Sequence, residues 1–582
     1  MRRTLATILL GCLIIATAGV PPACAADMVW TNAAGGEWNA ADNWMGGVPG
    51  ASDRALLSNS VASSYIVNYD IPMSAASISN LVVRNGGAGT NTLNINTNGF
   101  VVVNADAPYG SGPQIGTHGV INVNSGGVWV LKDTGASYPG LQFAGGTLNI
   151  NGGTLSNLNG RIFNGNTIAA GTLNLYSGVL WGSDIYRADA GGVLNIYGGL
   201  MYGNSSFGLD IGRSAAAAST VNMTNGVLYA PNFVGIGEGG VGILNLSGGT
   251  VTSGFFVVGQ AVDQHAKTST VNQTGGALVN LGSLRLGSVQ IEDGRSFNSP
   301  WTDTGIYSLS GGSVTNAGYL RVGFLYTTGT PGVVCNTNWG RLNISGGTWN
   351  QTGGTTNDGN LVNGAPLGQI AVSGGQITYY GNVSSYGWYT NSGTGVSEFR
   401  STATLSNLTH AGGTIRVGTN GSVSLVGNAA AYTNHGTLEM RGGTLTAATI
   451  NNPAGQRIDG NGLILGALND SGTLAATIGG TLTVSNLTFN SGAILAWDFT
   501  EATQGLLRVT GNLSLPASMA VTVNRISGRV RPSGYLMIDC ANAITNSLSG
   551  LVLTSGNTVG LSASGKQVFL YGPALGTMVT VK

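Results

Sequence analysis

Short alternations of apolar and polar residues recur along this chain, and most of them run into a Gly-Gly pair. The clearest example is 244–251, Leu-Asn-Leu-Ser-Gly-Gly-Thr-Val, with apolar residues at its first and third positions. A period of two is typical of a strand with one buried face, and Gly-Gly permits the positive φ of a sharp bend. Several copies continue into an apolar-x-apolar-Gly stretch, as at 256–259. One repeat is therefore expected to hold two or three short strands joined by tight turns.

The repeat occurs thirteen times, with spacings of 21 to 38 residues, mostly 21 to 28. A unit this small cannot bury its apolar face alone, but stacked units share a continuous core. We therefore predict an all-β fold, a right-handed parallel β-helix (solenoid) with an N-terminal cap and a C-terminal β cap; the handedness follows from the crossover preference. The copies begin at Leu93, Ile121, Leu148, Leu173, Leu194, Val221, Leu244, Val271, Tyr307, Leu342, Ile370, Leu408 and Leu438.

Asparagine fills the second position in nine of the thirteen copies. Stacked asparagine amides can hydrogen-bond along a solenoid axis, and asparagine also tolerates turn conformations. Both explanations are structural, and we prefer them to ligand binding. The predicted structural ladder comprises Asn149, Asn174, Asn195, Asn222, Asn245 and Asn272.

Composition and the first residues indicate an exported protein. Only 8% of the 582 residues are charged and the net charge is zero, which gives no electrostatic case for nucleic acid as a partner. Residues 1–26 join a positive start, an apolar run and an Ala-Cys-Ala cleavage site, as in a signal peptide. We expect an N-terminal cap at 27–92, β-helix repeats at 93–451 and a C-terminal β region at 452–582. We expect no transmembrane segment in the mature chain, and an extracellular or outer cell-surface location.

Three tryptophans, Trp30, Trp38 and Trp44, fall within fifteen residues after the predicted signal. Such a group could stack on sugars, or it could close the open end of the solenoid, where strand edges would otherwise be exposed. We favour the cap.

The pattern W…GG.W..A.NW..G.VP…D.A over residues 30–55 resembles the start of a family of repetitive bacterial surface proteins. These are autotransporter-passenger-like proteins with autotransporter-associated β-strand repeats, and the related exosortase-sorted proteins. Stretches 480–493 and 506–515 are also similar, and together with the Gly-Gly repeats the resemblance covers most of the mature chain. It implies a β-helix passenger displayed or released outside the cell. We expect neither the family's barrel nor its sorting tail in the last hundred residues, which leaves the anchoring route open.

Charged residues gather near corresponding turns of successive repeats: Asp184, Arg187, Asp210, Arg213 and Glu238. β-Helix enzymes that cleave acidic polysaccharides need a base and charge neutralisation, and glycoside hydrolases need paired carboxylates. The alternative interpretation is an ordinary set of solvated turns, which we prefer. The sequence predicts no catalytic residue and no cofactor. It also predicts no metal site, because its four histidines lack the spacing of zinc ligands. His410 is expected to be a structural strand residue.

The sequence therefore favours a non-enzymatic structural or adhesive surface protein. The alternative is a polysaccharide-active β-helix enzyme, either a lyase or a glycoside hydrolase, or a glycan-binding module. Extracellular glycans or cell surfaces are the expected partners in both cases, since repetition supplies reach and avidity without a dedicated pocket.

Overall fold

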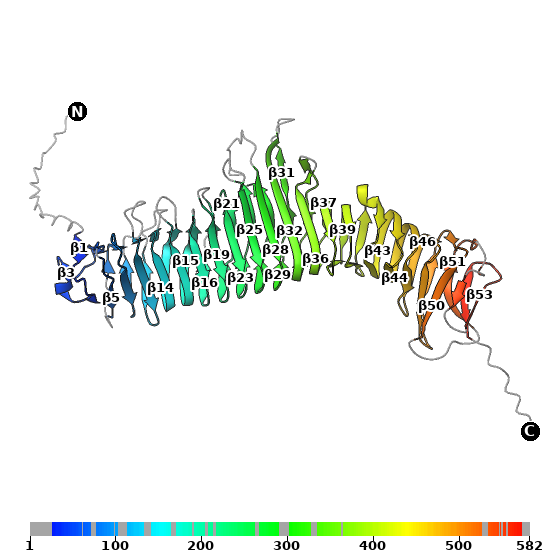
Figure 1. Ribbon diagram of the computed structural model, residues 1–582, viewed down its shortest axis with the longest axis horizontal. Helices are drawn as coiled ribbons and strands as arrows, with labels where there is room; N and C mark the ends of the chain where they lie inside the picture. The colour runs from blue at the N-terminus through cyan, green and yellow to red at the C-terminus, as the bar shows by residue number, and fades with distance from the viewer. Residues whose placement is uncertain are drawn as a thin grey trace, which may run out of the picture.

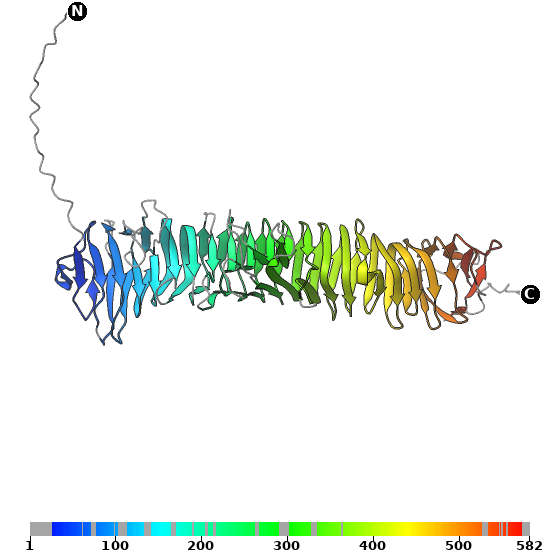
Figure 2. The same ribbon diagram turned by 90° about the horizontal axis from the view of Figure 1, so that it is seen from above.

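The protein forms a long rod of stacked strands (Figure 1), and Figure 2 shows the same rod from above. The described elements are strands except for two 3-10 turns, η1 (Ala41–Asn43) and η2 (Gly427–Ala430). The fold is an all-β, β-helix-like solenoid. This computed structural model describes residues 26–572 apart from 61, 71–76, 98, 103–112, 133–140, 165–169, 189–190, 204–207, 214–216, 262–266, 290–301, 328–333, 363–364, 526–533, 546–547, 549–550 and 554–556.

One turn of the solenoid contains three strands, as in β22 (Gly242–Leu246), β23 (Thr250–Ser253) and β24 (Phe256–Ala261). Each strand pairs in parallel with the corresponding strand of the next coil, so that Asn245 lies beside Asn272 and Thr252 beside Val279. The stacks that contain β22, β23 and β24 are called sheets A, B and C below.

Neighbouring coils repeat this arrangement along the rod. Sheet A includes β8 (Asn91–Ile95), β11 (Gly119–Asn124), β16 (Val193–Ile196), β19 (Ser219–Met223), β25 (Lys267–Gln273) and β28 (Asp303–Leu309). Sheet B includes β17 (Leu200–Gly203), β20 (Val227–Ala230), β26 (Ala277–Asn280) and β29 (Ser313–Asn316). Sheet C includes β18 (Leu209–Ile211), β21 (Val234–Glu238), β27 (Leu284–Val289) and β30 (Leu320–Val322). Long strands such as β14 (Thr147–Asn164), β15 (Thr172–Ala188) and β32 (Val334–Gln351) continue from one sheet into another.

The apolar positions of the repeat form the core. Leu244, Leu246 and Val251 are buried, and each contributes roughly 1.5–3 kcal/mol through removal from water. The Gly-Gly turns stack closely on one another. Gly249 has a φ of 77°, and a Cβ there would lie 2.6 Å from the carbonyl oxygen of Gly226. A larger residue would therefore strain the turn and clash with the preceding coil.

Parallel pairing extends on both sides of residues 93–451. It includes β5 (Tyr65–Tyr69) with β8, and β47 (Ile494–Phe499) with β50 (Met519–Arg525). Antiparallel pairing replaces it at the C-terminal end, where β54 (Gln567–Tyr571) pairs with β51 (Tyr535–Cys540) and β53 (Thr558–Leu561). A hairpin of β31 (Phe324–Thr327) with the start of β32 projects from the middle of the rod (Figure 1).

Candidate functional site

The structure brings three of the five predicted charged residues together. Arg213 Nη1 lies 3.5 Å from Asp210 Oδ2 and 4.0 Å from Glu238 Oε2. Asp210 belongs to β18 and Glu238 ends β21, and both carboxylates are buried. Arg187 is the backbone partner of Asp210 in the parallel pairing of β15 with β18, and Asp184 lies earlier in β15. The side chains of Asp184 and Arg187 lie outside the described part of the chain.

Chemically, this charged turn cluster has the features of a structural ion-pair group. Two buried carboxylates share one guanidinium, which is itself only partly exposed. Removing one partner of such a buried group typically leaves an uncompensated charge and costs about 3–5 kcal/mol. This arrangement favours a role in holding the coil turns together over general acid–base chemistry.

The three N-terminal tryptophans are buried against one another. Trp30 in β1 (Asp27–Trp30) pairs with Trp44 in β3 (Trp44–Met45), and their rings meet edge to face at 5.1 Å. Trp38 lies 4.8 Å from the Trp44 ring and accepts a 2.7 Å hydrogen bond from Trp44 Nε1 at its carbonyl oxygen. Phe100 completes the cluster, 5.2 Å from Trp38. Since Trp30 and Trp38 have no exposed area, their rings are not available to stack on a sugar.

Asparagine amides form a continuous row of hydrogen bonds along the outer side of sheet A. Each Nδ2 donates to the Oδ1 of the preceding coil at 2.8–2.9 Å. The row begins at Asn68, in the region expected to be a cap, and stops where Ser308 takes the place beside Asn272. Its nine members are Asn68, Asn94, Asn122, Asn149, Asn174, Asn195, Asn222, Asn245 and Asn272.

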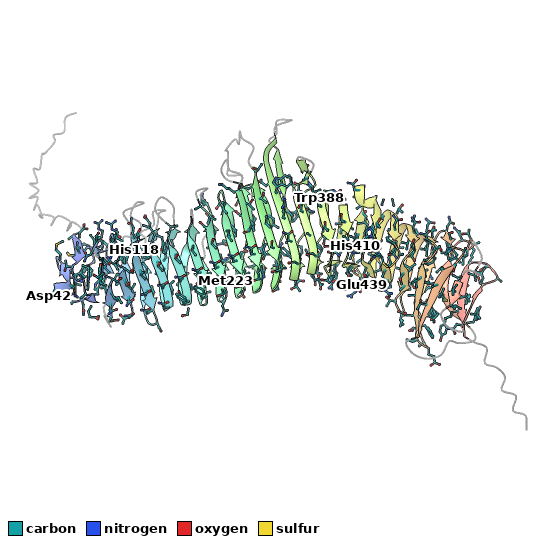
Figure 3. The ribbon with its side chains drawn as sticks, in the orientation of Figure 1. Asp42, His118, Met223, Trp388, His410 and Glu439 are labelled. Carbon is teal, nitrogen blue, oxygen red and sulfur yellow. The ribbon has the colours of Figure 1, made fainter. Side chains whose placement is uncertain are left out.

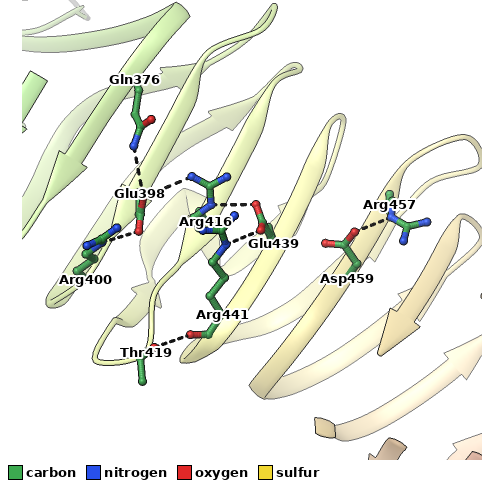
Figure 4. Close-up of polar contacts among 9 residues, drawn as sticks. All are labelled: Gln376, Glu398, Arg400, Arg416, Thr419, Glu439, Arg441, Arg457 and Asp459. Atoms are coloured by element: carbon green, nitrogen blue, oxygen red, sulfur yellow. Dashed lines mark hydrogen bonds and ion pairs between the residues drawn. The ribbon is translucent and has the colours of Figure 1, made fainter. Parts of the chain in front are cut away.

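A second polar surface, not predicted from the sequence, lies on the outer side of sheet B further along the rod. Glu398, Arg416, Glu439 and Asp459 occupy the same register position in four successive strands. These strands are β38 (Val396–Phe399), β40 (Thr414–Val417), β43 (Thr437–Asn452) and β44 (Arg457–Asp470). We call these four residues, with the flanking Arg400, Arg441 and Arg457, the charged row (Figure 4). Glu439 and His410 are labelled in this part of the rod in Figure 3.

Ion pairs connect the charged row across the strands. Arg416 donates from Nε to Glu439 Oε2 at 2.9 Å and from Nη1 to Glu398 Oε2 at 3.4 Å. The other oxygen of Glu398 accepts from Arg400 Nε, and that of Glu439 accepts from Arg441 Nε. The hydrogen bond to Glu398 raises the pKa of Arg400, so this arginine stays charged. The row is thus a chain of charge-assisted contacts that holds its guanidinium groups in fixed orientations.

A groove of about 360 Å³ opens at the end of the charged row. Two small side chains line this space, Ala475 and Ala476 of β45 (Thr473–Ala476), and Ala475 is the strand partner of Asp459. The charged lining residues are Glu439, Arg441, Arg457, Asp459 and Asp498. Arg457 donates from Nε to Asp459 Oδ2 at 2.6 Å. The volume and polar lining fit a small hydroxylated group, since ligand sites typically measure roughly 300–1,000 Å³.

Unequal coil lengths explain why the sequence did not reveal the charged row. Arg416 follows Glu398 by 18 residues and precedes Glu439 by 23, so no fixed period aligns them. A local signal exists, because opposite charges flank one apolar residue at 398–400, 439–441 and 457–459. Residues two apart on a strand share a face, so these triplets indicate ion pairs on an outer surface.

His410 is buried in β39 (Thr402–His410) and serves packing. Its Nδ1 lies 2.6 Å from the hydroxyl of Tyr432, and its Nε2 lies 3.4 Å from the carbonyl oxygen of Gly413. Burial lowers the pKa of His410 to about 4, so the ring is neutral at physiological pH. The described residues include no group of three His, Cys, Asp or Glu that could hold a metal ion.

Comparison with solved structures gives a distant likeness. The chain matches no family model, and no curated protein matches it. Among solved structures, the adhesin Hap of Haemophilus influenzae is similar over 88% of this chain at 13% identity, with a TM-score of 0.22. The chain spans 64% of the length of that structure. Within the described residues, no helix is both long and apolar enough to span a membrane.

Proposed function

We propose that this protein is an exported, non-enzymatic structural or adhesive surface protein of the passenger-like β-solenoid type. The observation that carries the proposal is the row of nine hydrogen-bonded asparagines on sheet A. Each amide is fixed by its neighbours and repeats at the strand spacing of about 4.8 Å. A rigid, repeated polar face suits many weak contacts along an extended partner better than it suits one chemical reaction.

Several finer features belong to this proposal. They are right-handed coiling, cap roles for residues 27–92 and 452–582, and export directed by residues 1–26. The signal-like residues 1–25 lie outside the described chain. The buried tryptophan cluster supports an N-terminal cap, because it fills the open end of the core with large aromatic groups. Extracellular glycans or cell surfaces are the proposed partners, and nucleic acid is not among them.

The polysaccharide-cleaving alternative has weaker support. Its best candidates, Asp210 and Glu238, are buried and share the guanidinium of Arg213. A carboxylate held in this way is a poor proton donor or acceptor for a substrate that must approach from solvent.

An adhesion measurement tests the proposal. Beads coated with residues 27–582 are flowed over cells and over immobilised extracellular polysaccharide, and their retention under shear is recorded. Beads coated with the same chain after irreversible heat unfolding are the control. We expect retention with the folded chain alone. Equal retention of both coatings, or of neither, would contradict an adhesive role.

A further inference from the structure

The charged row shows two layers of opposite charge at the surface of sheet B. Its carboxylates lie inside, with side-chain exposures of 3% for Glu398, 23% for Glu439 and 27% for Asp459. Its flanking arginines lie outside, with exposures of 46% for Arg400, 51% for Arg441 and 43% for Arg457. The carboxylates and arginines of the charged row nearly cancel in net charge. The most exposed groups, which an approaching molecule meets first, are the guanidinium groups.

The inner carboxylates are already engaged. Both oxygens of Glu439 accept from arginines, Oε1 from Arg441 and Oε2 from Arg416. Both oxygens of Glu398 do the same, with Gln376 as an additional donor to Oε2 at 3.4 Å. These carboxylates therefore orient the arginines and have little accepting capacity left for a ligand.

The exposed arginines leave their terminal nitrogens available. Arg400, Arg441 and Arg457 each reach a carboxylate through Nε, and their Nη atoms donate to no other described residue. The two Nη atoms of a guanidinium form a planar fork that matches a carboxylate or sulfate with two parallel hydrogen bonds. Because Nε is anchored, less side-chain entropy is lost when the fork binds an anion.

Two of the arginines, Arg400 and Arg441, also follow the axis of the rod. Val417 of β40 pairs with Phe399 on one side and Met440 on the other, so Arg400 and Arg441, which follow these two residues, are two strands apart. Two strand spacings correspond to about 10 Å along the axis. Arg457 lies in the next coil at a different register position, because it pairs with Thr437, but its side chain reaches back to Asp459 in the row and lines the groove with Arg441. An extended polymer carrying repeated anionic groups would meet these forks in turn if it lay along the rod.

From this geometry we infer that the charged row and its groove bind a linear anionic polysaccharide. Its carboxylate or sulfate groups pair with the forks of Arg400, Arg441 and Arg457, and one hydroxyl-rich sugar occupies the groove. The polar groove residues Asn461 and Thr477 supply further hydrogen-bonding groups. The groove lining contains no aromatic ring, whereas single-stranded nucleic acid is usually held by stacked aromatics. The inference rests on the proposed adhesive function and assigns it a site and a ligand class.

Equilibrium binding of residues 27–582 to four probes tests this site. The probes are polygalacturonate, dextran sulfate, unmodified dextran and a single-stranded DNA oligonucleotide. We expect binding to polygalacturonate, to dextran sulfate or to both, which separates carboxylate from sulfate as the recognised group. We expect no binding to dextran or DNA, and weaker binding in about 0.5 M NaCl because charge interactions are screened.

Variants separate fork recognition from charge. The double variant R441K/R457K keeps both charges but removes both forks, and should lose about tenfold or more in affinity. R400Q is an independent second variant with an expected loss in the same direction. Arg508 is the matched control, because it is also about half exposed and donates from Nε to an aspartate, Asp539, away from the row. R508Q should bind like the wild-type chain. Circular dichroism and the unfolding midpoint establish that each variant is folded.

The outcomes also distinguish this site from the adhesive function itself. Unchanged affinity in R441K/R457K and R400Q, equal losses in R508Q, or equal binding of DNA would overturn the assigned site. Absence of binding to both anionic probes would also overturn it. If coated beads still adhere in any of these cases, only the assigned site is wrong. If the wild-type chain neither adheres nor binds the probes, both the assigned site and the proposed adhesive function are wrong.

Discussion

Asn452 donates a 2.6 Å hydrogen bond from Nδ2 to Asp470 Oδ1 in the interior of the solenoid. It accepts in turn from Asn434 at 2.9 Å, so three buried side chains form a short ladder that ends at a carboxyl group. The amides of Asn434 and Asn452 each donate to a backbone carbonyl of the next coil as well. Asp470 cannot donate in this way while it is ionised. Burial also disfavours the charged form, and it raises the pKa of Asp470 from the ordinary 3.8 to about 6.

Asp470→Asn should stabilise the protein at neutral pH. The pKa of Asp470 is higher in the folded than in the unfolded chain, so its contribution to stability is complete below about pH 4 and is lost as the pH rises through about 6. An amide avoids the buried charge and supplies a donor. We expect the free energy of unfolding to rise by about 1–2 kcal/mol near pH 7.5 and the gain to vanish near pH 4, measured by urea titration.

The control for this change is Asp42→Asn. Asp42 is exposed in η1, and its replacement should change stability by less than about 0.5 kcal/mol at either pH. A gain for Asp470→Asn that is the same at acid and neutral pH would show that titration of this carboxyl is not the cause.

The sequence predicted the strands and turns well, because each repeat contains an alternation of apolar and polar residues followed by a Gly-Gly pair. The copy at Leu244 lies in sheet A and turns at Gly249, as expected. The copy at Leu438 is different, since Leu438 pairs with Ile415 in sheet B. The sheet A strand of that coil is β42 (Ala431–Thr433), which lacks the motif. An apolar-x-apolar stretch before Gly-Gly indicates a strand and a turn, but it does not specify which of the three corners the turn occupies.

The candidate site was harder to predict, for a physical reason. The ladder asparagines share one place in a motif, whereas the ion pairs of the charged row depend on register across coils of unequal length. Glu398 and Arg416 are neighbours only because β38 and β40 pair with the register that the structure shows. A single sequence contains the local triplets but does not fix that register.

His410 should make the stability of the protein sensitive to mild acid. Its pKa of about 4 lies below the ordinary 6.5, so the neutral ring stabilises the fold above about pH 6.5, and this contribution is lost as the pH falls through about 4. We expect the wild-type chain to lose about 2–3 kcal/mol of stability from this group over that interval. His410→Asn should be less stable at pH 7 but should show a flatter pH dependence. Parallel curves for the two proteins in denaturant titrations would rule out this role.

Asparagines within the ladder should contribute more to stability than the one at its end. Asn222 donates to Asn195 and accepts from Asn245, whereas Asn272 donates to Asn245 at the end of the row. Asn222→Ala removes two hydrogen bonds and should cost about 1–3 kcal/mol, and Asn272→Ala about half as much. The comparison of unfolding free energies provides its own control, and equal costs would contradict a continuous ladder.

Trp38→Ala should open the N-terminal end of the rod. Trp38 is fully buried against Trp44 and Phe100, and the cavity should cost about 3–5 kcal/mol. Trp388→Ala is the matched control, because Trp388 is 47% exposed on the outer side of β37 (Val383–Asn391) and should cost less than about 1 kcal/mol. Hydrogen exchange should show faster exchange in β1, β3 and β5 of the Trp38 variant. Unchanged protection there would contradict a packing role for this ring.

The central claim is that the chain binds extracellular glycans without cleaving them. A glycan array probed with purified residues 27–582, followed by mass analysis of every bound glycan after prolonged incubation, tests it most directly. We predict binding of one or more glycans that are recovered with their starting mass. Shortened chains would contradict the claim: products that have gained one water per cleaved bond would identify a hydrolase, and unsaturated products that are one water lighter than hydrolysis would give would identify a lyase.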